Sequence, residues 1–299
     1  MDELPPASAP VNLRVEHLTR PLGLGSRRPR LSWQLPAGSG AQRAYQVRLA
    51  PGTAAGWVPG GDSVLVSWPF APLSACQRVS WQVRVDTGRG ESPWSEPATF
   101  ETGPLAAADW TARWIRPAEA EPPPAARRPA YELRGTVTIG KPVTRARLYA
   151  TAHGLYEAFL GGRRVGDQEL APGFTQYATR LQVQAYDVTS LLELGANEFT
   201  ALLSDGWFRG QIGITRAHDQ WGSQTAFLCR KPDPERKSGI FGSCSEGTAP
   251  LLWTGWTLWP TRATRVPPSC SLTTRVMVFV MGTRLLNRFS RMQRARSRL

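Results

Sequence analysis

Hydrophobic and polar residues alternate over most of the first hundred positions of the chain. In residues 31–35 the apolar Leu31, Trp33 and Leu35 are separated by polar neighbours, and the same alternation runs through residues 45–49 and 81–85. A period of two is typical of half-buried β-strands. Residues 86–90 are rich in turn formers and precede a further strand-like run at 98–102. We therefore expect residues 10–103 to form a β-sandwich.

Three tryptophans mark this first sandwich. Trp33 and Trp81 lie within strand-like runs, and Trp94 follows in the stretch Ser92-Pro93-Trp94-Ser95-Glu96-Pro97. The order of these signals is similar to a fibronectin type III or immunoglobulin-like module, which is a likeness of fold and not of function. Because large aromatic residues at strand spacing are usually buried, we expect all three in the core and not on a sugar-binding surface.

Residues 104–129 break the alternation. They include the proline-rich stretch from Glu119 to Pro124, which continues neither a strand nor a helix. We expect a linker here. Its two tryptophans, Trp110 and Trp114, predict that it packs against a neighbouring domain.

Alternation resumes in residues 130–228. Strands are expected at 146–150, 156–160, 181–185 and 199–203, with the odd residues Leu181, Val183 and Ala185 on the buried face of the third. A tight turn at Gly161-Gly162 joins two strands, and Asp187 is expected to cap a short helical turn. The fold class is therefore all-β, with a jelly-roll (galactose-binding-like) β-sandwich after the first sandwich.

The last segment, residues 229–299, differs in composition from the rest. It holds 13 basic and 3 acidic residues, which leaves a net charge of only +3 for residues 1–228 out of +13 for the chain. Neither a strand nor a helix period persists, so we expect an irregular basic tail. One hypothesis is that the tail is an out-of-frame translation. The alternative is a nucleic-acid-binding arm in which arginines contact phosphates, namely Arg284, Arg288, Arg291, Arg294, Arg296 and Arg298.

The cysteines, the histidines and the apolar runs of the sequence argue against metal-binding, disulfide-rich and membrane-spanning classes of protein. The four cysteines show no CxxC spacing and the three histidines are scattered, so neither a zinc site nor a disulfide framework is predicted. The longest apolar run, from Val276 to Met281, is too short for the roughly 20 residues that span a bilayer. The first residues show no secretory signal, so the expected location is the cytoplasm.

An ordered set of motifs carries a resemblance to a known family. The motifs are Leu155-Tyr156-Glu157-Ala158-Phe159-Leu160-Gly161-Gly162, Leu170-Ala171-Pro172-Gly173-Phe174-Thr175-Gln176-Tyr177, Tyr186-Asp187-Val188-Thr189, Gly195-Ala196-Asn197 and Asp205-Gly206-Trp207-Phe208-Arg209-Gly210. Over residues 10–227 the chain resembles the amino-terminal region of bacterial α-L-rhamnosidases. Gly161 departs from the Asn that the family usually places there, but glycine tolerates the same positive φ.

The resemblance implies a parent reaction, the inverting hydrolysis of terminal α-L-rhamnosyl residues. In the family the carboxylates that perform it lie in a large α-helical barrel that follows these modules. We expect this chain to lack that barrel, and hence to have no catalytic residues of its own. Acids within the body are an alternative source of the required pair, but turns and caps account for them: Glu157, Asp167, Glu169, Asp187 and Asp205.

The second sandwich has a further predicted role in binding a rhamnose-containing glycan. The candidate residues are aromatic or charged, as sugar faces and hydroxyls require: Asp205, Trp207, Arg209, Tyr177, Asp219 and Trp221. No cofactor is expected, although the resemblance extends to calcium-dependent rhamnose-binding domains. Two alternatives stay open at this point. The same stretch could pack against the missing catalytic domain, or the chain could act as a free-standing carbohydrate-binding module.

Overall fold

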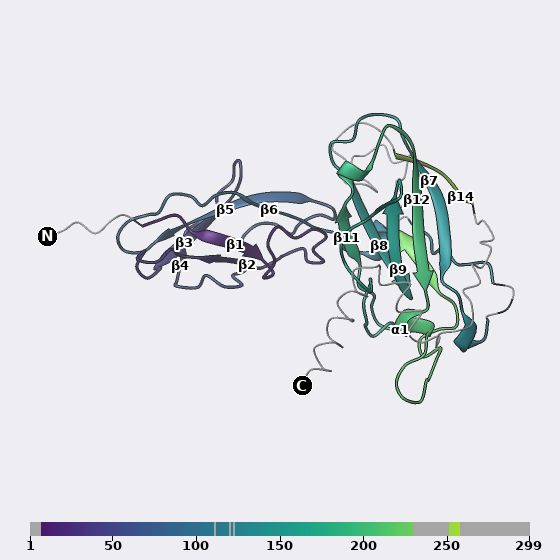
Figure 1. Ribbon diagram of the computed structural model, residues 1–299. Helices are drawn as coiled ribbons and strands as arrows, with labels where there is room; N and C mark the ends of the chain where they lie inside the picture. Colours follow the sequence, from purple (N-terminus) through teal and green to yellow (C-terminus); the bar gives the residue numbers. More distant parts are fainter. Residues whose placement is uncertain (1–6, 111, 120, 122, 230–250, 258–299) are drawn as a thin grey trace, which may run out of the picture. The chain divides into compact units, whose positions relative to one another are not determined.

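The computed structural model describes residues 7–110, 112–119, 121, 123–229 and 251–257, the last range by its backbone alone. The chain divides into two compact units, Met1–Trp110 and Thr111–Leu299 (Figure 1). In the described part of the chain, no helix has both the length and the apolar character to cross a membrane. The two units are strand-rich, which confirms the all-β class expected from the alternating pattern.

The first unit contains a two-stranded and a four-stranded antiparallel sheet. The two-stranded sheet pairs β1 (Val11–Val15) with β2 (Leu31–Gln34). The order in the larger sheet is β4-β3-β5-β6, formed by β4 (Val58–Pro59), β3 (Ala44–Leu49), β5 (Arg78–Asp86) and β6 (Ala98–Glu101). These strands coincide with the runs of period two in the sequence.

The core of the first unit forms where the alternation predicts it. Trp33 and Trp81 are 1% and 0% exposed, and Val83 and Val85 share the buried face of β5 with Trp81. The indole N–H of Trp33 donates to Gln42. Trp94 is different, because it is only half-buried and lies against the guanidinium groups of two arginines. The expectation that all three tryptophans lie in the core is thus wrong for Trp94.

The second unit is a sandwich of two antiparallel sheets. The five-stranded sheet has the order β10-β9-β12-β7-β14, and the three-stranded sheet has the order β11-β8-β13 (Figure 1). The bounds are β7 (Tyr131–Ile139), β8 (Arg147–His153), β9 (Leu155–Leu160), β10 (Arg163–Arg164), β11 (Gln184–Asp187), β12 (Gly195–Ser204), β13 (Ala226–Cys229) and β14 (Leu251–Thr257).

Aromatic rings join the two sheets of this sandwich. Phe227 of β13 lies 5.2 Å from Tyr156 of β9 and 6.2 Å from Phe199 of β12, measured between ring centroids. Phe199, Ala201 and Leu203 are fully buried, as their spacing along β12 predicts. At the turn from β9 to β10, Gly161 and Gly162 have φ of 54° and 72°, which confirms the tight hairpin.

For the strand expected at 181–185, both the start and the choice of buried residues are wrong. Val183 is 40% exposed, and the strand β11 begins only at Gln184. The residue that enters the core is Tyr186, whose hydroxyl lies 3.1 Å from the hydroxyl of Tyr156. Its ring lies so close to Gly166 that a side chain there would collide with it. The hydrogen-bonded tyrosine pair therefore sets the register, which hydropathy alone does not reveal.

Two further expectations concern the cap at Asp187 and the range 229–299. Asp187 accepts a hydrogen bond from the backbone N–H of Thr189 at 3.0 Å, at the start of the 3-10 turn η3 (Thr189–Leu191), although Val188 holds the capping position. Strand β14 pairs with β7 inside the range 229–299, where the sequence shows no strand period. The remaining expectations for that range, including the arginine-rich arm, fall on residues outside the described ranges.

Candidate functional site

The candidate site is built around a single helical turn, α1 (Gly206–Arg209), which follows β12 directly. Gly206 has φ of 51°, and a Cβ at this position would lie 2.5 Å from the side chain of Leu155. A helix of four residues has too few internal hydrogen bonds to be stable alone. Its geometry must therefore be imposed by its neighbours.

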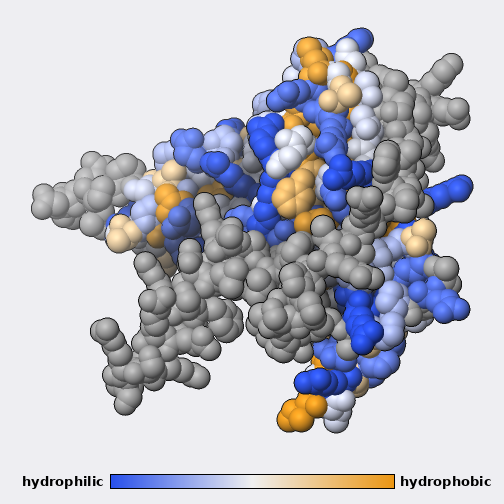
Figure 2. Space-filling model, turned by 45° about the vertical axis from the view of Figure 1, so that its right-hand side comes forward, coloured by the Kyte–Doolittle hydropathy of each residue, from blue (hydrophilic) through white to orange (hydrophobic). Residues whose placement is uncertain are grey.

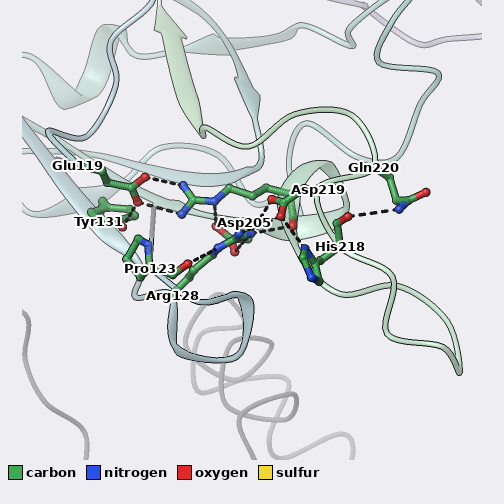
Figure 3. Close-up of polar contacts among 9 residues, drawn as sticks. Glu119, Pro123, Arg128, Tyr131, Asp205, His218, Asp219 and Gln220 are labelled. Carbon is green, nitrogen blue, oxygen red and sulfur yellow. Dashed lines mark hydrogen bonds and ion pairs between the residues drawn. The ribbon is translucent and has the colours of Figure 1, made fainter. Parts of the chain in front are cut away.

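Arg209 at the end of this turn is fully buried and forms a fork-like ion pair. Its Nη1 and Nη2 each donate to one carboxylate oxygen of Glu119 at 3.0 Å, and its Nε lies 3.4 Å from Asp205. The hydroxyl of Tyr131 also donates to Glu119 (Figure 3). Two parallel N–H···O bonds fix both the distance and the orientation of the two groups.

Arg128 forms the second half of the same arrangement and is only 8% exposed. It donates two bonds to Asp219, at 2.8 and 3.0 Å, and lies 3.6 Å from Asp205. It also donates to the backbone carbonyls of Pro123 and Arg209, at 2.9 and 3.1 Å. We call Glu119, Arg128, Asp205, Arg209 and Asp219 the arginine cluster (Figure 3).

The charges of the arginine cluster are nearly balanced. Two guanidinium groups face three carboxylates, and the ring of His218, on the exposed side, lies 2.5 Å from Asp219. The hydrogen bonds from Arg128 hold the pKa of Asp219 below its ordinary value. Burial raises the pKa of Asp205, and the nearby guanidinium groups of Arg209 and Arg128 oppose this rise. Buried charges are tolerated only when they are paired in this way.

Next to the arginine cluster lies a group of aromatic rings, Phe174, Tyr177, Trp207, Phe208 and Trp221, which we call the aromatic cluster. The ring of Phe174 stands edge-on to Tyr177, Trp207 and Trp221, with centroid distances of 6.1, 6.2 and 5.6 Å. Tyr177 lies 5.3 Å from both Phe208 and Trp221. Such offset and edge-to-face contacts are the favoured geometry of aromatic pairs.

The aromatic cluster reaches the surface of the molecule. Phe174 is 55% exposed, and Trp207 and Trp221 are half-buried, while Tyr177 and Phe208 lie beneath them. Over the described surface visible in Figure 2, hydrophobic residues are interspersed with hydrophilic ones. An exposed phenylalanine flanked by two partly exposed tryptophans offers apolar ring surface to a ligand.

A three-ring stack continues the aromatic cluster toward the start of the unit. His153 lies between Trp114 and Phe208, with centroid distances of 4.2 and 4.5 Å and nearly parallel planes. Burial, together with the charge of Arg116, lowers the pKa of His153. Backbone bonds between Ile115 and Phe227 attach the same segment to β13. The segment expected as a linker is thus packed within the second unit from Thr111 onward, as its tryptophan Trp114 suggested.

The six residues predicted to bind sugar fall into two adjacent groups. Tyr177, Trp207 and Trp221 belong to the aromatic cluster, whereas the three charged residues, Asp205, Arg209 and Asp219, belong to the arginine cluster. The charged groups of Asp205 and Arg209 face buried partners and not solvent. The prediction that these two side chains contact the sugar directly is untested, and their burial argues against it.

Four members of the two clusters were not predicted from the sequence: Glu119, Arg128, Phe174 and Phe208. Phe208 lies in the motif that contains Trp207 and is buried. Phe174 was visible as an aromatic residue directly after the turn that ends at Pro172-Gly173, and it is exposed there. Glu119 and Arg128 gave no local signal, because their partners lie 90 and 91 residues further along the chain. Only the folded structure brings these charges together.

The arginine cluster does not suit a calcium ion. Calcium takes six to eight oxygen ligands, mostly from carboxylates and carbonyls. Here the carboxylates of Glu119, Asp205 and Asp219 face guanidinium N–H donors, which fill the space beside them with positive charge. Among the described residues no group of three His, Cys, Asp or Glu side chains is arranged to hold a metal ion.

Four of the five acids considered as an alternative catalytic pair form ion pairs with arginines. Glu157 and Glu169 both pair with Arg164, at 3.0 and 3.3 Å. Burial raises the pKa of Glu157, against the opposing charge of Arg164. Asp187 pairs with Arg147 at 2.9 Å, and Asp205 lies in the arginine cluster. Asp167 is exposed.

The fold defines a class of protein, a tandem of two all-β domains. Residues 10–106 match the Rha78A-like N-terminal immunoglobulin domain, and residues 141–231 match the α-L-rhamnosidase N-terminal domain. The chain therefore carries the N-terminal immunoglobulin-like domain and the rhamnosidase N-terminal domain of α-L-rhamnosidases.

Individual relatives agree with this assignment. An α-L-rhamnosidase of Formosa agariphila is 32% identical over 241 residues, covering 72% of this chain and 26% of the relative. One from Streptomyces avermitilis is 28% identical, covering 72% of this chain and 38% of the relative. The chain thus spans between a quarter and two fifths of the length of these relatives.

Solved structures of the same family superpose on the chain. The α-L-rhamnosidase of Aspergillus terreus is 32% identical with a TM-score of 0.65, over 74% of this chain and 26% of that one. The Streptomyces avermitilis enzyme, solved in complex with L-rhamnose, is 25% identical with a TM-score of 0.66, over 83% of this chain and 40% of that one.

Proposed function

We propose that this chain is a non-catalytic accessory portion of an α-L-rhamnosidase, and that its aromatic cluster binds rhamnose-containing glycans. The parent reaction is the inverting hydrolysis of terminal α-L-rhamnosyl residues. The observation that carries the binding role is the exposed ring of Phe174 between the partly exposed Trp207 and Trp221. L-Rhamnose is a 6-deoxy sugar, and its methyl group and C–H faces suit such apolar rings.

The proposed lack of catalysis follows from how the acids are used. An inverting glycosidase needs a protonated acid and a carboxylate base about 6.5–9.5 Å apart, with space for water between them. Glu157, Glu169, Asp187 and Asp205 instead neutralise neighbouring arginines. A carboxylate committed to an ion pair inside the fold is poorly placed to exchange a proton with substrate.

Two measurements on the purified chain test this function. Isothermal titration with L-rhamnose should show saturable binding, and incubation with an aryl α-L-rhamnoside should release no phenol. The variants Phe174→Ala and Trp207→Ala should weaken binding at least about fivefold, since stacking contacts of this kind contribute about 1 kcal/mol or more. Trp94→Ala, in the first unit, is the control and should bind as the parent does.

Each outcome bears on the proposal. Turnover of the aryl rhamnoside would contradict the non-catalytic role. Absence of saturable binding, or equal affinity in Phe174→Ala and the parent, would contradict the binding role. A free-standing carbohydrate-binding module is the second candidate, since the same cluster would serve it. It predicts binding to immobilised rhamnose-containing polysaccharide that is strong enough to retain the chain on a column.

A further inference from the structure

We propose that Arg128 and Arg209 are positioning residues for the sugar-binding aromatic cluster, and that they hold it in place without a divalent cation. This inference rests on the proposed function of the aromatic cluster. It assigns to the arginine cluster a role that does not require its buried charges to touch the sugar.

The first step in the argument is where the arginine cluster holds the chain. Asp205 directly precedes α1 and Arg209 ends it, so their ion pair at 3.4 Å links the two ends of the turn that carries Trp207 and Phe208. Arg128 donates to the backbone carbonyl of Arg209 at 3.1 Å. It thereby satisfies a carbonyl at the end of the turn that has no partner within α1.

The second step is that the same arginines hold the returning chain. The backbone N–H of Asp219 donates to the carbonyl of Arg209 at 3.0 Å, and that of Trp221 donates to Phe208 at 3.3 Å. The bidentate bond from Arg128 to the Asp219 side chain reinforces this attachment. Trp207 therefore lies two residues from a held position on either side, Asp205 and Arg209, and Trp221 lies two residues after the held Asp219.

The third step concerns what supplies the positive charge. Loops rich in carboxylates are often organised by a bound cation, which needs oxygen ligands that point at one centre. In the arginine cluster the oxygens of Glu119 and Asp219 point at two guanidinium groups from other segments. A guanidinium group is planar, always charged and presents five donors, so it can join three segments as a metal ion would.

The experiment compares sugar affinity in the full chain with and without a chelator. The parent chain is titrated with L-rhamnose in calcium chloride and, separately, in EDTA, and the two dissociation constants should agree within twofold. The variant Arg209→Lys keeps one positive charge but loses the two-pronged contact with Glu119. It should weaken binding at least about tenfold, which corresponds to about 1.4 kcal/mol.

A matched control and a structural readout separate positioning from general destabilisation. Arg164→Lys alters another arginine of the second unit that contacts two carboxylates, Glu157 and Glu169, and should leave the affinity unchanged. Hydrogen exchange should become faster in peptides covering residues 205–221 of Arg209→Lys and remain as in the parent for Arg164→Lys. If Arg209→Lys does not fold, Asp219→Asn, at the solvent-facing side of the cluster, takes its place in both measurements.

The outcomes distinguish this inference from the function on which it rests. Binding that requires calcium, or unchanged affinity and unchanged exchange in Arg209→Lys and Asp219→Asn, overturns the inference and leaves sugar binding intact. A parent chain that binds L-rhamnose under neither condition overturns the proposed function, and with it the positioning role.

Discussion

Arg209 and Glu119 meet through two parallel hydrogen bonds of 3.0 Å, although 90 residues separate them in the chain. Both side chains are buried, at 0% and 8% exposure. The pair connects the end of α1 to the segment that enters the second unit. Together with the stack of Trp114 on His153, it packs the segment that the sequence predicts to be a linker into the second unit.

The first prediction concerns the energy of this pair. Glu119→Ala leaves Nη1 and Nη2 of the buried Arg209 without their carboxylate, so that only the contact of Nε with Asp205 at 3.4 Å remains. Breaking a buried ion pair in this way costs about 3–5 kcal/mol of stability. The double variant Glu119→Ala with Arg209→Met should recover a large part of that loss, because no unpaired charge remains. Urea-induced unfolding measures the stability of the single and the double variant.

The control is Glu132→Ala, which removes an exposed ion pair with Arg134 and should change the free energy of unfolding little. Equal losses of stability in Glu119→Ala and Glu132→Ala would contradict the prediction.

A second prediction is a pH dependence that arises from His153. Burial between Trp114 and Phe208 lowers its pKa below the ordinary 6.5. As the pH falls through 6.5 the unfolded chain binds a proton that the folded chain does not. The free energy of unfolding therefore decreases, and it levels off below the folded-state pKa.

The measurement for this prediction compares the parent with His153→Phe, which keeps a ring in the stack but cannot titrate. Denaturant unfolding at several pH values between 8 and 5 should show a smaller loss of stability for the variant. Parallel pH profiles for the two proteins would show that His153 does not contribute. The exposed His218 is present in both and cancels in the comparison.

The third prediction follows from the backbone at Gly154, between β8 and β9. Its φ is 128°, and a Cβ there would lie 2.2 Å from the backbone carbonyl oxygen of Ser204. Gly154→Ala should therefore destabilise the second unit by well over the ~1 kcal/mol typical of a point substitution. Gly140→Ala, where a Cβ meets nothing within 4 Å, is the control for the thermal unfolding midpoint. Similar midpoints for the two variants would be inconsistent with this backbone restriction.

A fourth prediction concerns the first unit, where the guanidinium groups of two arginines lie against the rings of two tryptophans. Arg48 lies 4.2 Å and Arg84 4.9 Å from the ring of Trp94, and Arg84 lies 5.0 Å from Trp57. Each cation–π contact contributes about 0.5–1 kcal/mol when partly exposed. Trp94→Ala should lower the unfolding midpoint of the first unit more than Trp94→Phe, which retains an aromatic face. Equal midpoints for these two variants would refute a cation–π contribution.

The strands of this protein could be predicted because their cause is local. In β5 the residues Trp81, Val83 and Val85 share one face, and all three are buried. In β9 the same holds for Tyr156, Ala158 and Leu160. In each strand the residues that share a face lie only two positions apart, so the alternation of side chains along one strand was sufficient to predict which of them are buried.

The predictions that failed depended on distant partners. Trp94 is drawn to the sheet surface by Arg48 and Arg84, and neither is its neighbour in sequence. The register around Val183 is decided by the hydroxyl contact between Tyr186 and Tyr156. For the site, Asp205, Trp207 and Arg209 were recognisable as members of one motif. Their distant partners Glu119 and Arg128 come from a segment with no pattern of its own.

The bond from Arg128 to Asp219 spans 91 residues, and this distance has a consequence for biosynthesis. At about 5–20 residues per second, a ribosome delivers Asp219 roughly 5–20 seconds after Arg128. During that interval Trp114, Glu119 and Arg128 have emerged without the groups that cover them. The arginine cluster can therefore form only late in synthesis, and β7 stays without both of its neighbours in the sheet, β12 and β14, until that later part of the chain has been made.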